Sequence, residues 1–281
     1  MANLTAHVGG SAPAQRVRAV PPATRRSGLP GTLRSELTKI RSVRSTWLTL
    51  AAFVVGGLVI AIAATAGNRR EAGQASFDPT AASLAGTVYF GELVIVVTGV
   101  LVITSEYGTR MMGTSLAAMP RRGVLYAAKA MVLGCVTLVV ALVTSFASFF
   151  AGQAALASTH AGASITSPGA LRAVLLTALF VTCCALLGFG LGAVIRHTAG
   201  AIAGLFGLLF IAPLVSNVLP KGAQRDALRW LPGNSLLNQI VAAKPAGTAD
   251  LFGPYGELAV FAGYAVIAVA AGALLFLCRV A

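Results

Sequence analysis

Two acidic side chains lie in or beside long apolar runs, and these are the clearest candidates for chemically active residues in the sequence. Glu92 lies inside an apolar run, roughly 12 Å from its nearer end at about 1.5 Å per residue. A carboxylate at that depth is costly unless it faces water, finds a partner or stays protonated. Two interpretations stay open: an acid that only packs helices, or a group that lines a substrate path. Glu106 follows the same run.

Motifs for catalysis and nucleotide binding are absent from the sequence. It contains no Gly-x-x-x-x-Gly-Lys-[Ser/Thr] phosphate loop, no His-Glu-x-x-His motif and no Gly-x-Ser-x-Gly motif. The histidines are scattered, and the cysteines all lie in apolar runs with no histidine at ligand spacing: His7, His160, His197, Cys135, Cys183, Cys184 and Cys278. We therefore expect no catalytic residue, metal site, disulfide or cofactor in this chain.

The composition is typical of a membrane protein. Of 281 residues, 57% are hydrophobic and 10% are charged, and the mean hydropathy is +0.82. An average soluble domain has about 25% charged residues. A net charge of +13 would suggest nucleic acid as a partner of a soluble protein. Here the basic residues cluster beside apolar runs, which indicates membrane topology and contact with anionic lipid instead.

Six apolar runs are long enough to cross a hydrocarbon core of about 30 Å as helices. They predict an all-α integral membrane domain at 47–281, with spans at about 47–66, 83–104, 131–153, 171–195, 199–219 and 257–278, the third helix beginning near 124. The preceding residues 1–28 are rich in Ala, Pro, Arg and Ser without periodicity. We expect them to form a disordered cytosolic tail.

The segment 29–46 has the pattern of an amphipathic helix lying flat in the lipid headgroup layer. Its apolar residues recur every three or four positions, and its cations stand off this stripe. The stripe is Leu29, Leu33, Leu37, Ile40, Val43 and Trp47, and the cations are Arg34, Lys39, Arg41 and Arg44. The residues alone favour a passive lipid anchor over an elbow that also contacts a cytosolic partner.

The loop at 105–123 is the longest polar interruption on the basic side of the membrane. A soft apolar face at helical spacing is followed by a proline that ends the helix: Met112, Ser115, Leu116, Met119 and Pro120. Glu106 and Arg110 are spaced as an i, i+4 pair, worth a few tenths of a kcal/mol when exposed. A helix with Met on its face suits protein docking, but residue types alone favour a connecting loop whose arginines set topology.

Small residues and a second loop complete the pattern. Gly188-x-x-x-Gly192 and Gly200-x-x-x-Gly204 predict close helix packing, either within the chain or at a dimer seam. The loop at 220–256 predicts two short helices, the second capped by Asn234 with an apolar side at Leu236, Leu237, Ile240 and Val241.

The distribution of Lys and Arg predicts the orientation in the membrane. Fourteen of the 21 lie on the side of the N-terminal tail and seven on the opposite side. Because the richer side is cytosolic, we expect both termini in the cytosol. The residues Arg196, His197 and Thr198 then form a tight cytosolic hairpin between the fourth and fifth spans.

A set of motifs recurs along the predicted cytosolic side: LRSELTKIRSVRSTW at 33–47, TSEY at 104–107, LAAMPRR at 116–122, AAK at 127–129 and RHTAGA at 196–201. Together they resemble the permease subunits of type-2, exporter-class ATP-binding-cassette (ABC) transporters in their actinobacterial form. The similarity spans 33–281, and the block from Ser-Glu-Tyr to Pro-Arg-Arg is its most specific part.

The resemblance implies a six-helix domain with an elbow helix, a coupling helix between the second and third spans, and short external helices before the sixth. It implies that two such domains, identical or different, face each other in the bacterial cell membrane and are driven by separate ATPase subunits that bind ATP and Mg. It also makes the loop an ATPase-docking site with the coupling residues Glu106, Tyr107, Arg110, Met112, Leu116, Met119, Pro120, Arg121 and Arg122.

Glu92 departs from the expected family pattern, which has an uncharged polar residue such as Gln there, so no substrate is carried over from relatives. Two rival functions stay open. One is a sensor or scaffold that signals through a partner without transport. The other is a membrane-embedded enzyme acting on lipids, which predicts a His, Asp or Ser constellation that the spans do not show.

Overall fold

The computed structural model describes residues 29–42, 44–72, 74, 76–108, 122–159, 161–216, 218, 220, 239–244 and 253–278. Within this part of the chain every regular element is a helix, which confirms the all-α prediction. The tail, residues 109–121 of the coupling loop and most of the loop at 220–256 lie outside the described residues. What the sequence predicts for them therefore stays a prediction.

Among the described residues, five helical stretches are long and apolar enough to cross a membrane. They are α2 (Arg44–Gly67), the continuous run of α3 (Pro79–Ala85), η2 (Gly86–Phe90) and α4 (Gly91–Gly108), then α6 (Arg122–Leu156), α7 (Ala170–Ile195) and α12 (Pro254–Cys278). They correspond to the first, second, third, fourth and sixth predicted spans.

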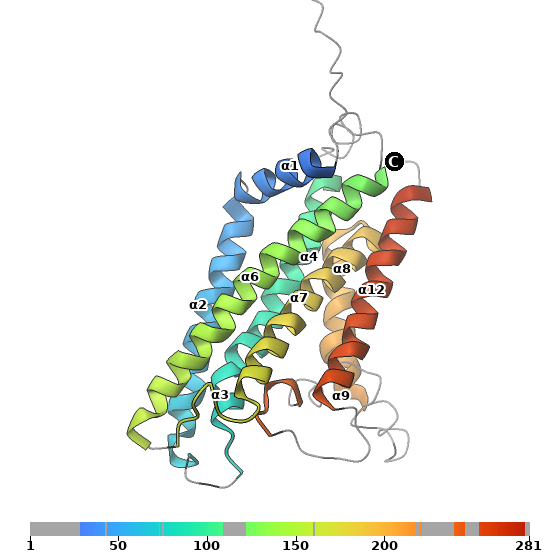
Figure 1. The fold of residues 1–281 in the computed structure, drawn as a ribbon. Coiled ribbons are helices and arrows are strands. Elements are labelled where there is room, and N and C mark those ends of the chain that lie inside the picture. The colour runs from blue at the N-terminus through green and yellow to red at the C-terminus, as the bar shows by residue number, and fades with distance from the viewer. Residues whose placement is uncertain are drawn as a thin grey trace, which may run out of the picture.

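The predicted fifth span coincides with a helical run that changes type. It consists of α8 (Thr198–Phe206), η4 (Gly207–Ile211) and α9 (Ala212–Ser216), and its apolar part, Thr198–Ile211, is shorter than the other spans. Figure 1 shows α8 and α9 running alongside the bundle toward the end opposite α1. The five long helices are thus established, and a sixth crossing stays a prediction.

The helix α1 (Leu29–Ser42) lies across one end of the bundle, which we call the α1 end (Figure 1). The last turns of α4 and α12 and the first turns of α6 reach the same end (Figure 1). The predicted coupling loop therefore leaves and re-enters the bundle beside α1. The opposite end, where α3 and α9 lie, is called the far end.

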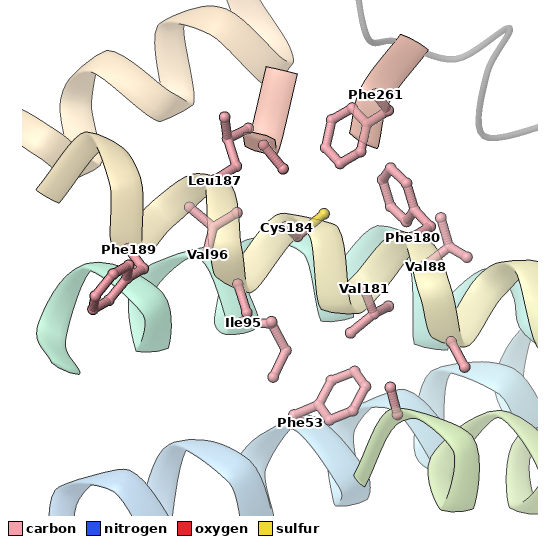
Figure 2. Close-up of a cluster of buried hydrophobic side chains, with 14 of the residues drawn as sticks. Phe53, Val88, Ile95, Val96, Phe180, Val181, Cys184, Leu187, Phe189 and Phe261 are labelled. Atoms are coloured by element: carbon pink, nitrogen blue, oxygen red, sulfur yellow. The ribbon is translucent and has the colours of Figure 1, made fainter. Parts of the chain in front are cut away.

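The helix α7 is the centre of the bundle, because it packs against α4, α6 and α12. Most of its side chains are buried, as expected for a helix that is apolar on all sides. The ring of Phe180 on α7 lies 4.8 Å from that of Phe261 on α12, measured between centroids. Figure 2 shows the surrounding cluster, with Phe53 from α2, Ile95 and Val96 from α4, and Val181, Cys184, Leu187 and Phe189 from α7.

Glycines allow α7 to approach α4 at backbone distance. A Cβ added at Gly188 would overlap the carbonyl oxygen of Val96, and one at Gly99 would overlap that of Ala185. The first Gly-x-x-x-Gly motif thus packs within the chain. In contrast, the nearest neighbouring atom to a Cβ at Gly204 would be 3.7 Å away, so the second motif makes no close helix crossing at this position.

Candidate functional site

The predicted coupling residues are described only at the two ends of their loop. Glu106 and Tyr107 belong to the last turn of α4, and Arg122 is the first residue of α6. The remaining members of the set lie outside the described residues: Arg110, Met112, Leu116, Met119, Pro120 and Arg121. The structure describes the helices at the α1 end that flank this loop.

A buried ion pair fastens α1 to the first turns of α6. The Nζ atom of Lys129 lies 2.6 Å from Oε2 of Glu36, and Nζ of Lys39 lies 2.9 Å from Oε1 of the same carboxylate. Glu36 and Lys129 are only 3% and 4% exposed. Each charge therefore depends on the other, because a buried ion without its partner is strongly destabilising.

The residues that α1 buries against the bundle do not belong to its apolar stripe. The buried residues of the helix are Thr32 and Glu36, whereas Leu37 and, at the start of α2, Trp47 are exposed. Leu33 and Lys39 are partly exposed and Arg44 is exposed, while the side chains of Ile40, Arg41 and Val43 lie outside the described part. Thr32 and Glu36 thus face the protein, and the exposed Leu37 and Trp47 are available to lipid.

The connection between α7 and α8 is the tight hairpin that the sequence predicts. The helix α7 ends at Ile195 and α8 begins at Thr198. Arg196 ends α7 with a left-handed backbone, φ 58°, a conformation common after a helix C-terminus. The ring nitrogen Nδ1 of His197 accepts a hydrogen bond of 3.2 Å from the amide of Gly200, which caps α8.

This hairpin is tied to the last turns of α4 and α12. The hydroxyl of Thr198 donates a hydrogen bond of 2.9 Å to that of Thr104. The guanidinium of Arg196 lies 5.4 Å from the ring centroid of Tyr107, within cation–π range, and donates to the carbonyl of Leu275 at 3.2 Å. The predicted coupling residue Tyr107 therefore contacts the hairpin that starts α8.

Glu92 lies on a groove between α4 and the segment formed by α8 and η4. The residue is 4% exposed. The groove holds about 30 Å³, and its other lining residues are all apolar: Leu93, Val96, Val97, Ile202, Leu205, Phe206, Leu209 and Phe210. Glu92 is thus the one ionisable group among them.

One π-helical segment lines this groove, and another precedes Glu92 in the sequence. The segment η2 ends at Phe90, two residues before Glu92, and η4 supplies Leu209 and Phe210. A π-turn adds a residue to the helical turn and so rotates the side chains that follow it. The two segments therefore help to decide which residues of α4 and η4 face the groove, a displacement that helical periodicity in the sequence does not reveal.

At the far end, α3 and α7 hold part of the predicted external loop. One carboxylate oxygen of Asp78 caps α3 at the amides of Thr80 and Ala81, and the other accepts a hydrogen bond of 2.7 Å from the amide of Ala243. Arg172 donates to the carbonyls of Ala242 and Ala243 at 2.7 and 3.2 Å. Ile240 and Val241, from the predicted apolar side of the second short helix, are buried.

The sequence profile of a family described as ABC-2 family transporter protein matches residues 32–214. This range begins in α1 and ends in α9, so it contains the ion pair of Glu36, the α7–α8 hairpin and the Glu92 groove. No curated protein matches the sequence.

The chain belongs to the ABC-2 transporter family. It is therefore a multi-pass permease subunit of an ABC transporter, a transport subunit that works with an ATPase partner. The description fits the five membrane-length helices. The resemblance to ABC-2 permeases that the sequence motifs indicate is thereby confirmed at the level of the family.

Several contacts of this ABC-2 permease are not predictable from motif spacing. Glu36 and Lys129 both occur in motifs that carry the family resemblance, but they are far apart in the sequence and their pairing is a tertiary contact. One signal was present, since Glu36 is the single acid of a basic amphipathic segment. For the bond between Thr104 and Thr198, the sequence offers no comparable signal.

Proposed function

We propose that this permease is the transmembrane subunit of an exporter, and that its ATPase docks on the loop between α4 and α6. The observation that supports this most is the set of contacts at the α1 end. The loop connects α4 to α6, and each of these helices contacts a further element. Lys129 of α6 forms an ion pair with α1, and Thr104 and Tyr107 of α4 contact the α7–α8 hairpin.

The proposed mechanism uses these contacts as mechanical links. ATP and Mg bind to two ATPase subunits, which close on each other and displace the docked loop. The pair of Glu36 and Lys129 makes α1 follow α6, and the hairpin makes α8 follow α4. Since α8 and α4 form the two walls of the Glu92 groove, the same displacement reaches a site inside the membrane. Access to a cavity between two permease copies then alternates.

The proposed orientation places the α1 end in the cytosol of a bacterial cell, with both termini inside. The excess of Lys and Arg on this side supports it. The exposed apolar residues Leu37 and Trp47 would lie among lipid tails, and the cations Lys39 and Arg44 beside anionic headgroups. Export, as opposed to import, is supported by the resemblance to exporter-class permeases.

The docking surface is tested by placing a charge on its predicted apolar face. We expect Met112→Glu or Leu116→Glu to abolish capture of the ATPase by the tagged permease, because a carboxylate opposes burial in an apolar interface. The matched controls are Met112→Leu and Leu116→Met, which keep the face apolar and should keep capture. Membrane fractionation shows whether each variant inserts. Equal capture by inserted Glu variants would refute this docking site.

A further inference from the structure

The Glu92 groove contains a carboxylate that lacks a counter-charge in the described part of the chain. The other lining residues are apolar, and the ion pairs found among the described residues involve Glu36 instead. An acid in such surroundings is stabilised by a cation that enters the groove with it. In its ionised form the carboxylate therefore selects against anions and gives neutral molecules no ionic partner.

Aromatic side chains add to this preference for a cation. The rings of Phe206 and Phe210 stack with centroids 4.9 Å apart and an interplanar angle of 25°, and both line the groove. A cation near an aromatic face is attracted by the ring quadrupole, more strongly where water is excluded. Glu92 and these two rings thus present the same chemical preference from two helices.

The size and the rim of the groove restrict the ligand further. A volume of about 30 Å³ has room for a group the size of one or two water molecules, which fits an ammonium group with few substituents. The rim residues Leu93 and Phe206 are 40% and 50% exposed. An apolar body attached to the ammonium can therefore lie outside the groove, on these side chains.

We propose that the groove binds a cationic amphiphile, a primary or secondary ammonium attached to an apolar body, with the ammonium paired to the ionised carboxylate of Glu92. The apolar body lies along Leu93 and Phe206. That such a molecule is also the transported cargo rests on the proposed permease function. Binding itself requires only this chain and involves no covalent step.

The test measures binding to the full-length permease in nanodiscs of zwitterionic phosphatidylcholine. The probe is tritiated octylamine, followed by scintillation proximity, with empty nanodiscs to subtract partitioning into lipid. We expect saturable binding that unlabelled octylamine displaces and octanol, its neutral analogue, does not. Glu92→Gln should weaken binding by about tenfold or more, since hydrogen bonds to charged groups contribute the larger share of such contacts. Phe206→Leu should weaken it about two- to fivefold.

The matched control is Glu257→Gln, because Glu257 is equally buried, 2% exposed, and does not line the groove. It should bind octylamine as the unaltered chain does. Absence of saturable binding, displacement by octanol, or unchanged binding by Glu92→Gln would overturn the proposal. So would a change in oligomeric state of Glu92→Gln by light scattering, which would place Glu92 against a second copy. Because no ATPase is present, failure here is distinguishable from failure of the docking experiment.

Discussion

Glu36 occupies a position where two demands conflict. It belongs to a basic helix suited to anionic lipid, yet it carries a negative charge and is buried. The structure resolves the conflict by giving each carboxylate oxygen a lysine, Lys39 on the same helix and Lys129 on α6. A well-packed apolar pair can be as stable as a buried ion pair, so this contact is better understood as fixing where α1 attaches than as a source of stability.

That view predicts a specific pattern of stability. Lys129→Met leaves the buried Glu36 carboxylate with Lys39 as its only lysine partner. It should lower the free energy of unfolding by about 3–5 kcal/mol. The double variant Glu36→Leu with Lys129→Met should recover most of this loss, because no buried charge is left. Unfolding by sodium dodecyl sulfate in mixed micelles measures both. A double variant no more stable than the single one would contradict the argument.

Lys39 provides the matched control for this pair. Its side chain is 36% exposed, and exposed ion pairs typically contribute about 0–1 kcal/mol. Lys39→Met should therefore change the unfolding midpoint much less than Lys129→Met does. A similar loss for the two lysines would mean that burial does not distinguish the two contacts.

Single residues also show where prediction from sequence ends. The polarity of Glu92 and Glu36 is visible in the sequence, and so is the cost of burying them. Their surroundings are not visible, because Lys129 beside Glu36 and the rings of Phe206 and Phe210 in the Glu92 groove come from segments that only the tertiary fold brings together. Sequence therefore indicates which side chains need an explanation, and the structure supplies it.

Among the elements, long helices follow the hydropathy of the sequence closely. The fourth span is predicted at 171–195 and observed at Ala170–Ile195, because its apolar run has the length needed to cross a hydrocarbon core of about 30 Å. The prediction is weaker where a helix changes type. The segments η2 and η4 interrupt the second and fifth predicted spans. Gly86, the first residue of η2, lies so close to the Gly57 carbonyl that a Cβ would overlap it.

The crossing of α4 and α7 gives a prediction at this scale. Gly188→Ala places a Cβ against the carbonyl oxygen of Val96, and overpacking of this kind typically costs about 1–3 kcal/mol. We expect a lower melting temperature of the purified permease, measured by fluorescence-detected size exclusion after heating. Gly204→Ala is the control, since its Cβ would have no neighbour closer than 3.7 Å, and it should melt no lower than the unaltered chain. Equal losses in both variants would argue against a specific crossing at Gly188.

For the molecule as a whole, sequence and structure agree on a helical membrane bundle, and α1 lies beside the last turns of α4 and the first turns of α6 at its α1 end (Figure 1). In the described residues five of the six predicted spans have membrane length, whereas the apolar part of the predicted fifth span, Thr198–Ile211, is shorter. The orientation of the bundle in the membrane is predicted only from the distribution of Lys and Arg, because the fold is the same in either orientation. The predicted cytosolic position of the α1 end is thus open to direct measurement.

Single-cysteine labelling decides this orientation. In a background without Cys135, Cys183, Cys184 and Cys278, which are all free thiols, an impermeant maleimide applied to intact cells should label Gly162→Cys, before α7, and leave Ala199→Cys, after it, unlabelled. Both residues lie in or beside short connections, and α7 separates them.

Ser115→Cys, inside the coupling loop, should behave like Ala199→Cys and become reactive only after permeabilisation. The reason is that an ATPase that binds cytosolic ATP can dock only on the cytosolic side. Labelling of Ser115→Cys in intact cells would exclude the docking proposal. Labelling of Ala199→Cys but not Ser115→Cys would mean that the α7–α8 hairpin lies outside the cell, so that α7 ends on the external side.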